Sequence, residues 1–360
     1  MSEKKSKGQE LLEKLSYKKR NFFEISSEKE IDKMYEYCDG YKDFLDKAKT
    51  EREATAYAIA AAEKKGYKAY HFGDKLVVGG KYYYNNHDKS IAVFKIGKNA
   101  LDADGVRIIA AHIDSPRIDL KQNPMYEDSG FCLLKTHYYG GIKKYQWVTL
   151  PLAIHGVVAK TNGDVMTVNI GEDKNDPVFC VTDLLIHLSQ EQLKKRADSV
   201  IEGEQLDILF ASRPLEGKEK EAVKEAVLAL LEKKYDMKEE DFLSAELEIV
   251  PAGKARNCGI DESMIMAYGQ DDRVCAYTSL VAMLEADDPE KTTCCLLTDK
   301  EEIGSVGATG MQSHFFENTV AEIMNAMGGF SEISLRRCLA SSRMLSSDVS
   351  AGFDPTFVSI

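Results

Sequence analysis

The chain has 360 residues, of which 44% are hydrophobic and 29% are charged, and its formal net charge is −12. This length and hydrophobic content allow a large buried core and suggest two domains. The negative charge argues against nucleic acid or an anionic membrane as a partner. No apolar stretch approaches the roughly 20 residues that a membrane-spanning helix needs.

The N-terminus and the cysteines indicate the cellular compartment. Residues 1–20 are charged and rich in lysine, and they lack the apolar core of a secretory signal. The eight cysteines show no C-x-x-C spacing, and several lie in apolar runs, as small buried side chains do. We therefore expect a reducing compartment, the cytoplasm.

The first third of the chain predicts the opening of an α/β domain. Residues 1–65 are predicted to be helical, because apolar residues recur at steps of three and four. A pair of strands is expected within residues 70–84, and further strands are expected at 90–95 and 106–112.

The middle of the chain has a different character. From residue 133 to 170, alternating and β-branched residues predict β-sheet with turns between the strands. Helices are expected at 183–195 and at about 218–234, and a strand is expected within 236–252. This part of the chain is therefore expected to be rich in β-structure.

Helical and parallel-strand character resumes near residue 260 and includes a helix at 274–285. We expect an α/β fold, with a mixed, mostly parallel sheet flanked by helices, formed by residues 1–116 and 259–360 together. Residues 117–258 are expected to form a β-rich domain inserted into it.

The first candidate functional residues are His112 and Asp114, at the end of the predicted strand 106–112. Side chains on a strand alternate between faces, so these two are expected to point the same way. A carboxylate placed in this way can orient a metal-binding imidazole. Taken alone, the pattern fits a histidine with a structural role better.

Three acidic clusters follow later in the chain. Asp271 and Asp272 precede the predicted helix 274–285, where acidic residues also serve as caps. Glu301 and Glu302 follow an apolar run, at the position where open α/β sheets place their active sites. The third cluster contains Asp348, which alone would be assigned to an ordinary turn.

Together, these residues fit a site for two divalent metal ions that share a bridging carboxylate. Histidine, aspartate and glutamate are suitable ligands for zinc, and also for manganese or cobalt. Of the adjacent residues Glu301 and Glu302, one could be a ligand while the other takes the proton from the attacking water. No H-E-x-x-H or G-x-S-x-G motif is present, which argues against single-zinc and serine hydrolase mechanisms.

At these residues the chain resembles the aspartyl aminopeptidase family of zinc metallopeptidases, and in particular its bacterial branch. The resemblance runs in collinear order through most of residues 20–355. Besides the acidic clusters, its motifs are Tyr139-Gly140-Gly141, Trp147, Leu185-Ile186-His187-Leu188, Asp241 to Leu247, Val250 to Arg256, and Tyr268 to Arg273, the last of which contains the first acidic cluster.

The resemblance implies a role for each candidate residue. It implies a cytoplasmic enzyme that binds two zinc ions per subunit and removes an N-terminal Asp or Glu from peptides with a free N-terminus. It also implies a homo-oligomer assembled through the inserted domain. The implied metal ligands are His112, Asp271 as the bridge, Glu302 and Asp348. Glu301 is the implied general base, Asp114 the partner that orients His112, and His187 a residue that contacts substrate in a neighbouring subunit's site.

One departure concerns the second metal ion. In the family this ion also takes a histidine near the C-terminus, and His314, the last histidine here, comes too early to align with it. We therefore expect the sequence to be truncated at its C-terminus. The alternative function is a catalytically impaired oligomeric assembly protein that lacks this ligand.

Overall fold

The computed structural model describes residues 6–217, 220–286 and 289–358. The chain divides into two units, residues 1–41 and 42–360. The first unit contains α1 (Lys7–Leu15), α2 (Phe22–Ile25) and most of α3 (Glu28–Lys47). Ser6 begins α1 with a capping box, in which its side chain and that of Gln9 each accept a hydrogen bond from the other residue's backbone N–H. The prediction of an N-terminal helical region is confirmed within the described residues.

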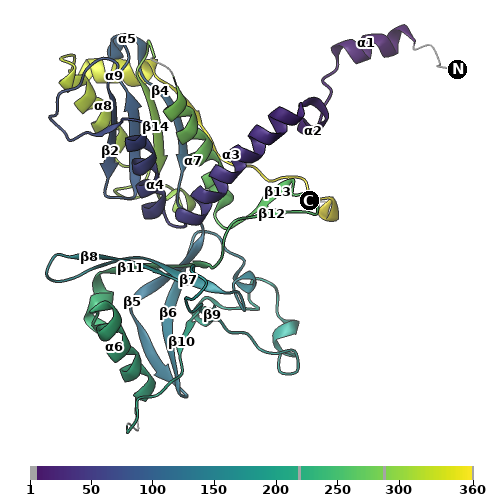
Figure 1. The fold of residues 1–360 in the computed structure, drawn as a ribbon, viewed down its shortest axis with the longest axis vertical. Coiled ribbons are helices and arrows are strands. Elements are labelled where there is room, and N and C mark those ends of the chain that lie inside the picture. The colour runs from purple at the N-terminus through teal and green to yellow at the C-terminus, as the bar shows by residue number, and fades with distance from the viewer. Residues whose placement is uncertain (1–5, 218–219, 287–288, 359–360) are drawn as a thin grey trace. The chain divides into compact units, whose positions relative to one another are not determined.

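The second unit contains a six-stranded mixed sheet, here called sheet A (Figure 1). Strands β14, β4 and β15 run parallel to one another, and β3 runs antiparallel to β14. The predicted α/β fold is therefore confirmed. In spatial order the strands are β1 (Lys68–Ala69), β2 (Lys81–Asn86), β3 (Ser90–Lys95), β14 (Thr293–Thr298), β4 (Arg107–His112) and β15 (Arg343–Ser346).

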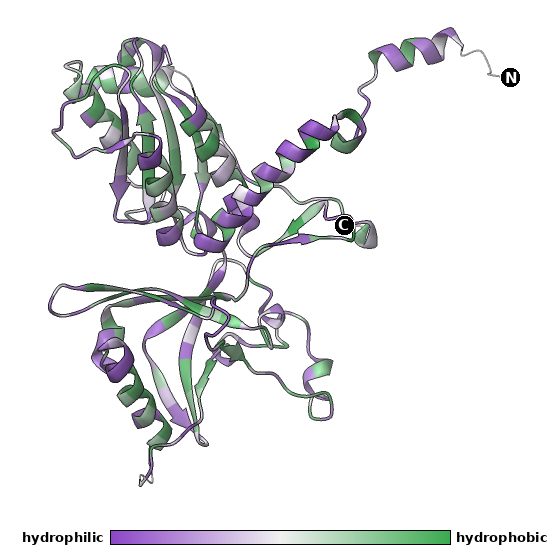
Figure 2. Cartoon of the chain, viewed as in Figure 1, coloured by the Kyte–Doolittle hydropathy of each residue, from purple (hydrophilic) through white to green (hydrophobic). Residues whose placement is uncertain are grey.

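Helices pack on both faces of sheet A, because its central strands are apolar on both faces. On one face, α4 (Glu51–Lys64) contacts β3, and α7 (Gln270–Glu285) contacts β4 and β14. On the other face, Ile108 and Ala110 of β4 share a core with α5, α8 and α9. Figure 2 shows the central strands as hydrophobic. The bounds of these last helices are α5 (Leu101–Asp104), α8 (Phe315–Ala326) and α9 (Glu332–Ser341).

A second, seven-stranded sheet, here called sheet B, is antiparallel throughout. Helix α6 (Ala222–Tyr235) packs on it through Val223, Val227 and Leu231, which are spaced four residues apart and so lie on one helix face. In spatial order the strands are β8 (Val165–Ile170), β7 (Leu152–Ala159), β11 (Ala245–Pro251), β5 (Arg117–Asp128), β6 (Phe131–Tyr139), β10 (Ile208–Ala211) and β9 (Cys180–Val181).

The remaining elements are short. A two-stranded hairpin, β12 (Arg256–Cys258) and β13 (Met264–Met266), connects the last strand of sheet B to α7. The 3-10 turns are Lys144–Gln146, Gln192–Lys194, Gly203–Gln205, Glu239–Ser244, Glu301–Ile303 and Pro355–Phe357. All the strands of sheet B lie within residues 117–258, and the boundaries of an inserted domain there remain a prediction.

Several local predictions were wrong. Residues 183–195 form no helix beyond the turn Gln192–Lys194. The apolar residues 184–186 and 188 are nearly consecutive, so they cannot form the single stripe that a helix would bury, and all of them are exposed.

Three other predicted elements have different bounds. Of the strand pair expected within 70–84, only the beginning of β2 lies in that range, because its partner β1 ends at Ala69. The helix expected from about residue 218 begins at Ala222, and residues 218–219 lie outside the described part. The strand expected within 236–252 starts only at Ala245, after a 3-10 turn.

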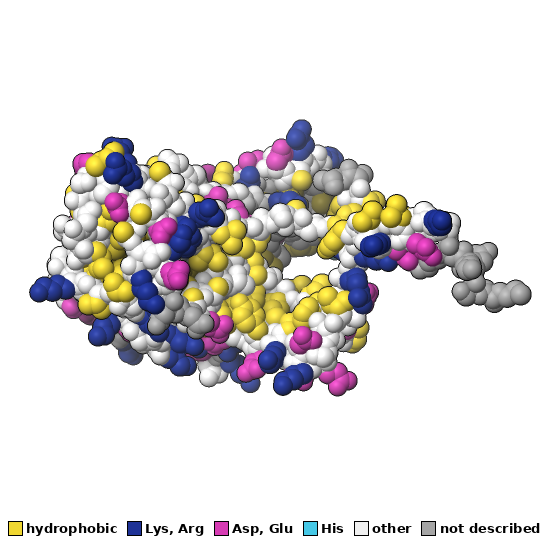
Figure 3. All heavy atoms as spheres, turned by 90° about the horizontal axis from the view of Figure 1, so that it is seen from above, with side chains coloured by type: hydrophobic (Ala, Val, Ile, Leu, Met, Phe, Trp, Pro, Cys, Tyr) yellow, Lys and Arg dark blue, Asp and Glu magenta, His cyan; other side chains and the backbone are white. Residues whose placement is uncertain are grey.

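Two surface properties bear on possible partners. Of the helices in the described ranges, none is both long and apolar enough to cross a membrane. On the face drawn in Figure 3, basic side chains are interspersed with acidic and hydrophobic ones.

Candidate metal centre

The candidate residues gather at the carboxyl ends of three parallel strands. His112 is the last residue of β4, and it pairs in register with Thr298, the last residue of β14. Glu301 and Glu302 follow β14, and Asp348 follows β15. Because parallel strands end at the same edge of a sheet, the fold brings residues far apart in sequence to one place.

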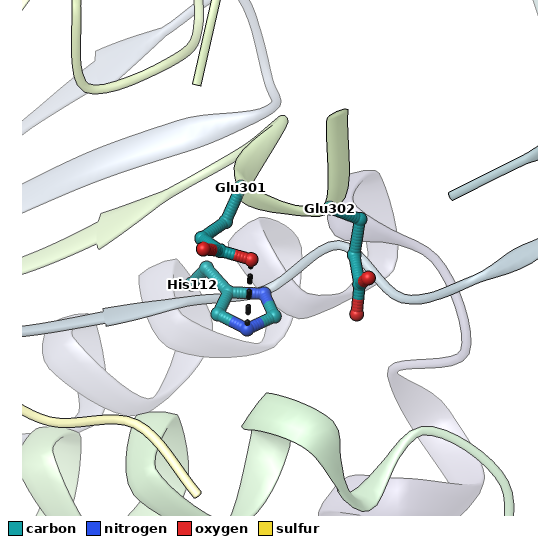
Figure 4. Close-up of side chains that lie close together, drawn as sticks. All are labelled: His112, Glu301 and Glu302. Carbon is teal, nitrogen blue, oxygen red and sulfur yellow. Dashed lines mark ion pairs between the residues drawn. The ribbon is translucent and has the colours of Figure 1, made fainter. Parts of the chain in front are cut away.

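The His112 imidazole lies at the base of this acidic site. Its side chain is 4% exposed, and its Nε2 is 3.3 Å from Asp271 Oδ1, 3.7 Å from Glu301 Oε2 and 3.9 Å from Asp348 Oδ1. The three carboxylate side chains are 47–57% exposed. Figure 4 shows Glu301 over the His112 ring, with Glu302 beside it. The imidazole therefore faces several carboxylates that solvent can reach.

Asp271 is held in position through its backbone at the start of α7. Ser115 donates a hydrogen bond from its hydroxyl to the Asp271 carbonyl at 2.6 Å. Arg273, which is buried, donates to Ser115 Oγ at 2.7 Å and to the Lys49 carbonyl at 2.9 Å. The next carboxylate, Asp272, is fully buried. Of this acidic pair, it is therefore Asp271 that presents an open carboxylate to His112.

Asp114 is fully buried, and both of its carboxylate oxygens accept hydrogen bonds. Oδ1 lies 3.3 Å from His112 Nδ1 and accepts a hydrogen bond from the Glu301 N–H at 3.1 Å. Oδ2 accepts one from the Glu302 N–H at 3.2 Å and one from the Tyr139 hydroxyl at 2.7 Å. Asp114 therefore contacts both the imidazole and the backbone that carries the two glutamates.

The negative charge of the site shifts its pKa values. Burial lowers the pKa of His112, but the hydrogen bond and charge of Asp114 outweigh it and raise that pKa to about 9. Burial, together with the charge of Asp271, raises the pKa of Glu302 to about 7. Such crowding of carboxylates is favourable when a cation sits between them.

The donor atoms are close enough to share metal ions. One candidate group consists of His112, Asp271 and Asp348, and a second consists of His112, Glu301 and Glu302. Within each group the ligand atoms lie within 4.8 Å of one another. One imidazole with several carboxylates suits zinc. The residues therefore fit a divalent metal centre.

Some residues of this site were missed at the sequence level, and one predicted residue lies elsewhere. Tyr139 and Arg273 belong to the motifs given above and Ser115 follows Asp114, but their roles arise from contacts that join distant segments. His187 belongs to neither candidate metal group and is exposed on the irregular segment 183–191.

Another acidic cluster has a different environment. Glu51, Glu246 and Glu248 also bring three ligand atoms within 4.8 Å of one another. Here, however, Lys89 Nζ lies 3.0 Å from Glu51 and also contacts Glu246. Arg117 lies 3.4 Å from Glu51 and 3.1 Å from Glu248. The chain itself thus supplies the positive charges in this cluster, which we call the paired cluster.

A histidine surrounded by carboxylates, at the carboxyl edge of an α/β sheet, is the arrangement of a metal-dependent hydrolase. The sequence pattern of the aminopeptidase I zinc metalloproteases (M18) matches residues 44–360. This chain belongs to that family of zinc metallo-aminopeptidases.

Individual relatives agree with this assignment. A probable M18 family aminopeptidase 1 from Clostridium acetobutylicum is 55% identical over 346 residues, which cover 95% of this chain and 74% of the relative. The crystal structure of an M18 aminopeptidase from Thermotoga maritima superposes with a TM-score of 0.89 at 40% identity, over 95% of this chain and 75% of that one. This chain thus spans about three quarters of their length.

A more distant structure shares the fold. The mApe1 dodecamer of S. cerevisiae superposes with a TM-score of 0.69 at 21% identity, over 89% of this chain and 73% of that one. At this identity the likeness concerns the fold alone.

Proposed function

We propose that this chain is a di-zinc aminopeptidase that removes an N-terminal Asp or Glu from peptides. The observation that carries the proposal is the convergence of His112, Asp271, Glu301 and Asp348 at one edge of sheet A. The number of zinc ions and the preference for acidic residues rest on the resemblance to aspartyl aminopeptidases. Manganese or cobalt would suit the same ligands.

The proposed ligands divide between two ions. His112, Asp271 and Asp348 would hold the first ion, whereas Asp271 and Glu302 would contribute to the second. Asp114 orients the His112 ring, since its backbone carbonyl lies 3.0 Å and its Oδ1 3.3 Å from the Nδ1 atom. His112 Nε2 lies 3.3 Å from Asp271 and 3.9 Å from Asp348, which supports the first set of ligands, and Glu301 lies at a similar distance of 3.7 Å.

Glu301 is the proposed general base. When bound, the zinc ions lower the pKa of the attacking water and polarise the scissile carbonyl group. Glu301, whose side chain is 47% exposed, takes the proton from that water and returns it to the leaving amine. Its backbone N–H donates a hydrogen bond to Asp114 Oδ1 at 3.1 Å, which fixes the main chain from which the side chain extends.

The test uses the full chain. Purified protein is stripped with a chelator, reloaded with zinc, manganese or cobalt, and assayed on Asp-, Glu-, Leu- and Ala-p-nitroanilides. We expect hydrolysis of the Asp and Glu substrates that is lost on chelation and restored by zinc, with the second ion bound more weakly than the first, because its proposed ligands are two carboxylates without an imidazole. Faster release of Leu would contradict the substrate proposal, and metal-independent hydrolysis would contradict the metal proposal.

We further propose a homo-oligomer assembled through residues 117–258, with the S. cerevisiae dodecamer as the precedent for a higher assembly. The exposed segment around His187 supports this, because Leu185, Ile186 and Leu188 are 57–68% exposed. In this arrangement His187 contacts substrate in a neighbouring subunit's site. A monomer at micromolar concentration in light scattering would contradict the proposal.

We infer a cytoplasmic location. Seven of the cysteines are free thiols, namely Cys132, Cys180, Cys258, Cys275, Cys294, Cys295 and Cys338, and four of these, Cys132, Cys294, Cys295 and Cys338, are buried. Free thiols in this number fit a reducing compartment. Fractionation of the native cells tests this inference, and recovery in the extracellular fraction would contradict it.

A further inference from the structure

Tyr139 connects sheet B to the metal centre. It is the last residue of β6, it is 7% exposed, and its hydroxyl donates a hydrogen bond to Asp114 Oδ2 at 2.7 Å. The only other donor to that oxygen among the described contacts is the Glu302 N–H, at 3.2 Å. Tyr139 therefore donates the shorter of the two hydrogen bonds that Asp114 Oδ2 accepts.

Arg117 holds the Tyr139 ring. The two residues are directly opposite each other on β5 and β6, and the guanidinium carbon lies 3.9 Å from the ring centroid. Arg117 is itself buried and paired, with its Nε 2.8 Å from Asp119 Oδ1 and 3.1 Å from Glu248 Oε2. Moving Arg117 would separate buried charges, which is costly. The Tyr139 ring therefore lies against a guanidinium group whose position is fixed by its buried ion pairs.

The end of β6 also lies against Glu302. Gly140 has a φ of +69°, and a Cβ added there would come within 3.2 Å of Glu302 Cβ. The strand end thus packs directly against the segment that carries the two glutamates. Sheet B contacts the centre at two points: the Asp114 carboxylate and the Glu302 side chain.

We propose that Tyr139, held by Arg117, is a positioning residue for the metal centre. Its hydroxyl stops the Asp114 carboxylate from rotating, so that one oxygen stays on His112 and Glu301 while the other stays on Glu302. Imidazole and glutamates then keep a fixed geometry for the metal ions. The inference rests on the proposed function, because it concerns the same centre.

The test compares Tyr139→Phe with Tyr138→Phe in the full chain. Tyr138 is the neighbouring residue on β6, its side chain points to the opposite face, and it is 50% exposed. Zinc affinity is measured by competition with a chromophoric chelator, and thermal unfolding of the metal-free proteins checks the fold. We expect zinc affinity to fall about tenfold in Tyr139→Phe, as for outer-shell partners of metal ligands, and to be unchanged in Tyr138→Phe.

Arg117 is tested through a double-mutant cycle. Arg117→Lys keeps a positive charge for Glu248 but loses the planar group that stacks on the ring. If Arg117 acts through Tyr139, adding Arg117→Lys to Tyr139→Phe causes little further loss of zinc affinity. Fully additive losses would overturn the Arg117 part of the proposal.

The remaining outcomes separate this inference from the proposed function. Wild-type protein that binds no zinc overturns both. Wild-type protein that binds zinc, with equal affinity in Tyr139→Phe, overturns the positioning role alone. Equal losses of affinity in Tyr138→Phe and Tyr139→Phe would also overturn it, because the effect would then not depend on the Asp114 contact.

Discussion

The two acidic clusters of this chain contain similar groups but have opposite environments. Around His112, the carboxylates of Asp271, Glu301 and Asp348 are about half-exposed, and among the described contacts no lysine or arginine pairs with them. In the paired cluster, Glu51 and Glu248 are 0–2% exposed, and the cations of Lys89 and Arg117 lie 3.0 Å and 3.1 Å from them, respectively. The comparison suggests that carboxylates paired within the chain stabilise the fold, whereas those left open are available to metal ions.

The largest effect is expected at Glu301, the proposed general base in the cluster around His112. Glu301→Gln should lower kcat/KM by about 10²- to 10⁴-fold, because an amide cannot accept the proton from water. Zinc content and the unfolding temperature should stay close to those of the wild type, which metal analysis and calorimetry can check. Near-normal turnover by this variant would show that Glu301 is not the base.

The next effect concerns the paired cluster. Lys89→Met removes a cation that lies 3.0 Å from the fully buried Glu51 and should lower the free energy of unfolding by roughly 3–5 kcal/mol. Lys47→Met, at an exposed pair with Asp43, should cost at most about 0.5 kcal/mol. Urea unfolding measures both. Equal losses of unfolding free energy in the two variants would show that buried and exposed ion pairs do not differ in their contribution to stability.

A third prediction asks whether only the open cluster binds metal. Glu302→Gln should weaken zinc binding by at least about tenfold, because it removes a carboxylate beside His112. Glu246→Gln makes the same change in the paired cluster and should leave zinc affinity unchanged. Chelator competition measures both variants. Weakened binding in Glu246→Gln would mean that the two clusters are not independent.

The smallest effect is a pH dependence of stability. His155 is buried between Glu53, at 2.8 Å, and Glu172, at 3.1 Å, and Glu172 also pairs with Lys49. Burial lowers the pKa of His155, but the hydrogen bonds that its ring donates to Glu172 and Glu53 outweigh it and raise the pKa above its usual value.

The sign of this effect follows from the raised pKa. The stabilisation by His155 is fully present below the unfolded pKa of about 6.5 and is lost as pH rises through the higher folded value. His155→Gln should flatten the fall in unfolding free energy above about pH 6.5, as measured by urea unfolding at a series of pH values. His71→Gln, at an exposed histidine, is the control, and the same flattening there would refute the assignment.

The parts that could be predicted from sequence are those set by local pattern. Apolar runs predicted β4 and β14, and parallel strands must end at one edge, so His112 and Glu301 could be expected to meet. Family resemblance, and not local pattern, assigned the bridging role to Asp271 over Asp272 and divided the roles of base and ligand between the two glutamates. Those roles remain predictions.

The remaining features depend on contacts that no local pattern contains. Arg117 and Glu248 are 131 positions apart by their residue numbers, and they meet because β5 pairs with β11 in sheet B. The stacking of Arg117 on Tyr139 follows from strand register, which hydrophobic periodicity does not specify at residue level. The helix predicted at 183–195 failed for a different, local reason, because the apolar residues 184–186 and 188 are nearly consecutive and do not lie on one helix face.

The two neighbouring strands that lead to Asp348 and His112, β15 and β4, differ in how well they are packed. Strand β15 pairs with β4 through Arg343 to Ser346, and all four of its residues are exposed, whereas the last three residues of β4 are buried. Asp348 thus follows a strand with little packing to resist local opening, and His112 ends a well-packed one. Binding of a cation to Asp348 is then thermodynamically linked to the pairing of β15. Amide hydrogen exchange at residues 343–346 should accordingly slow on zinc binding far more than exchange at residues 107–112.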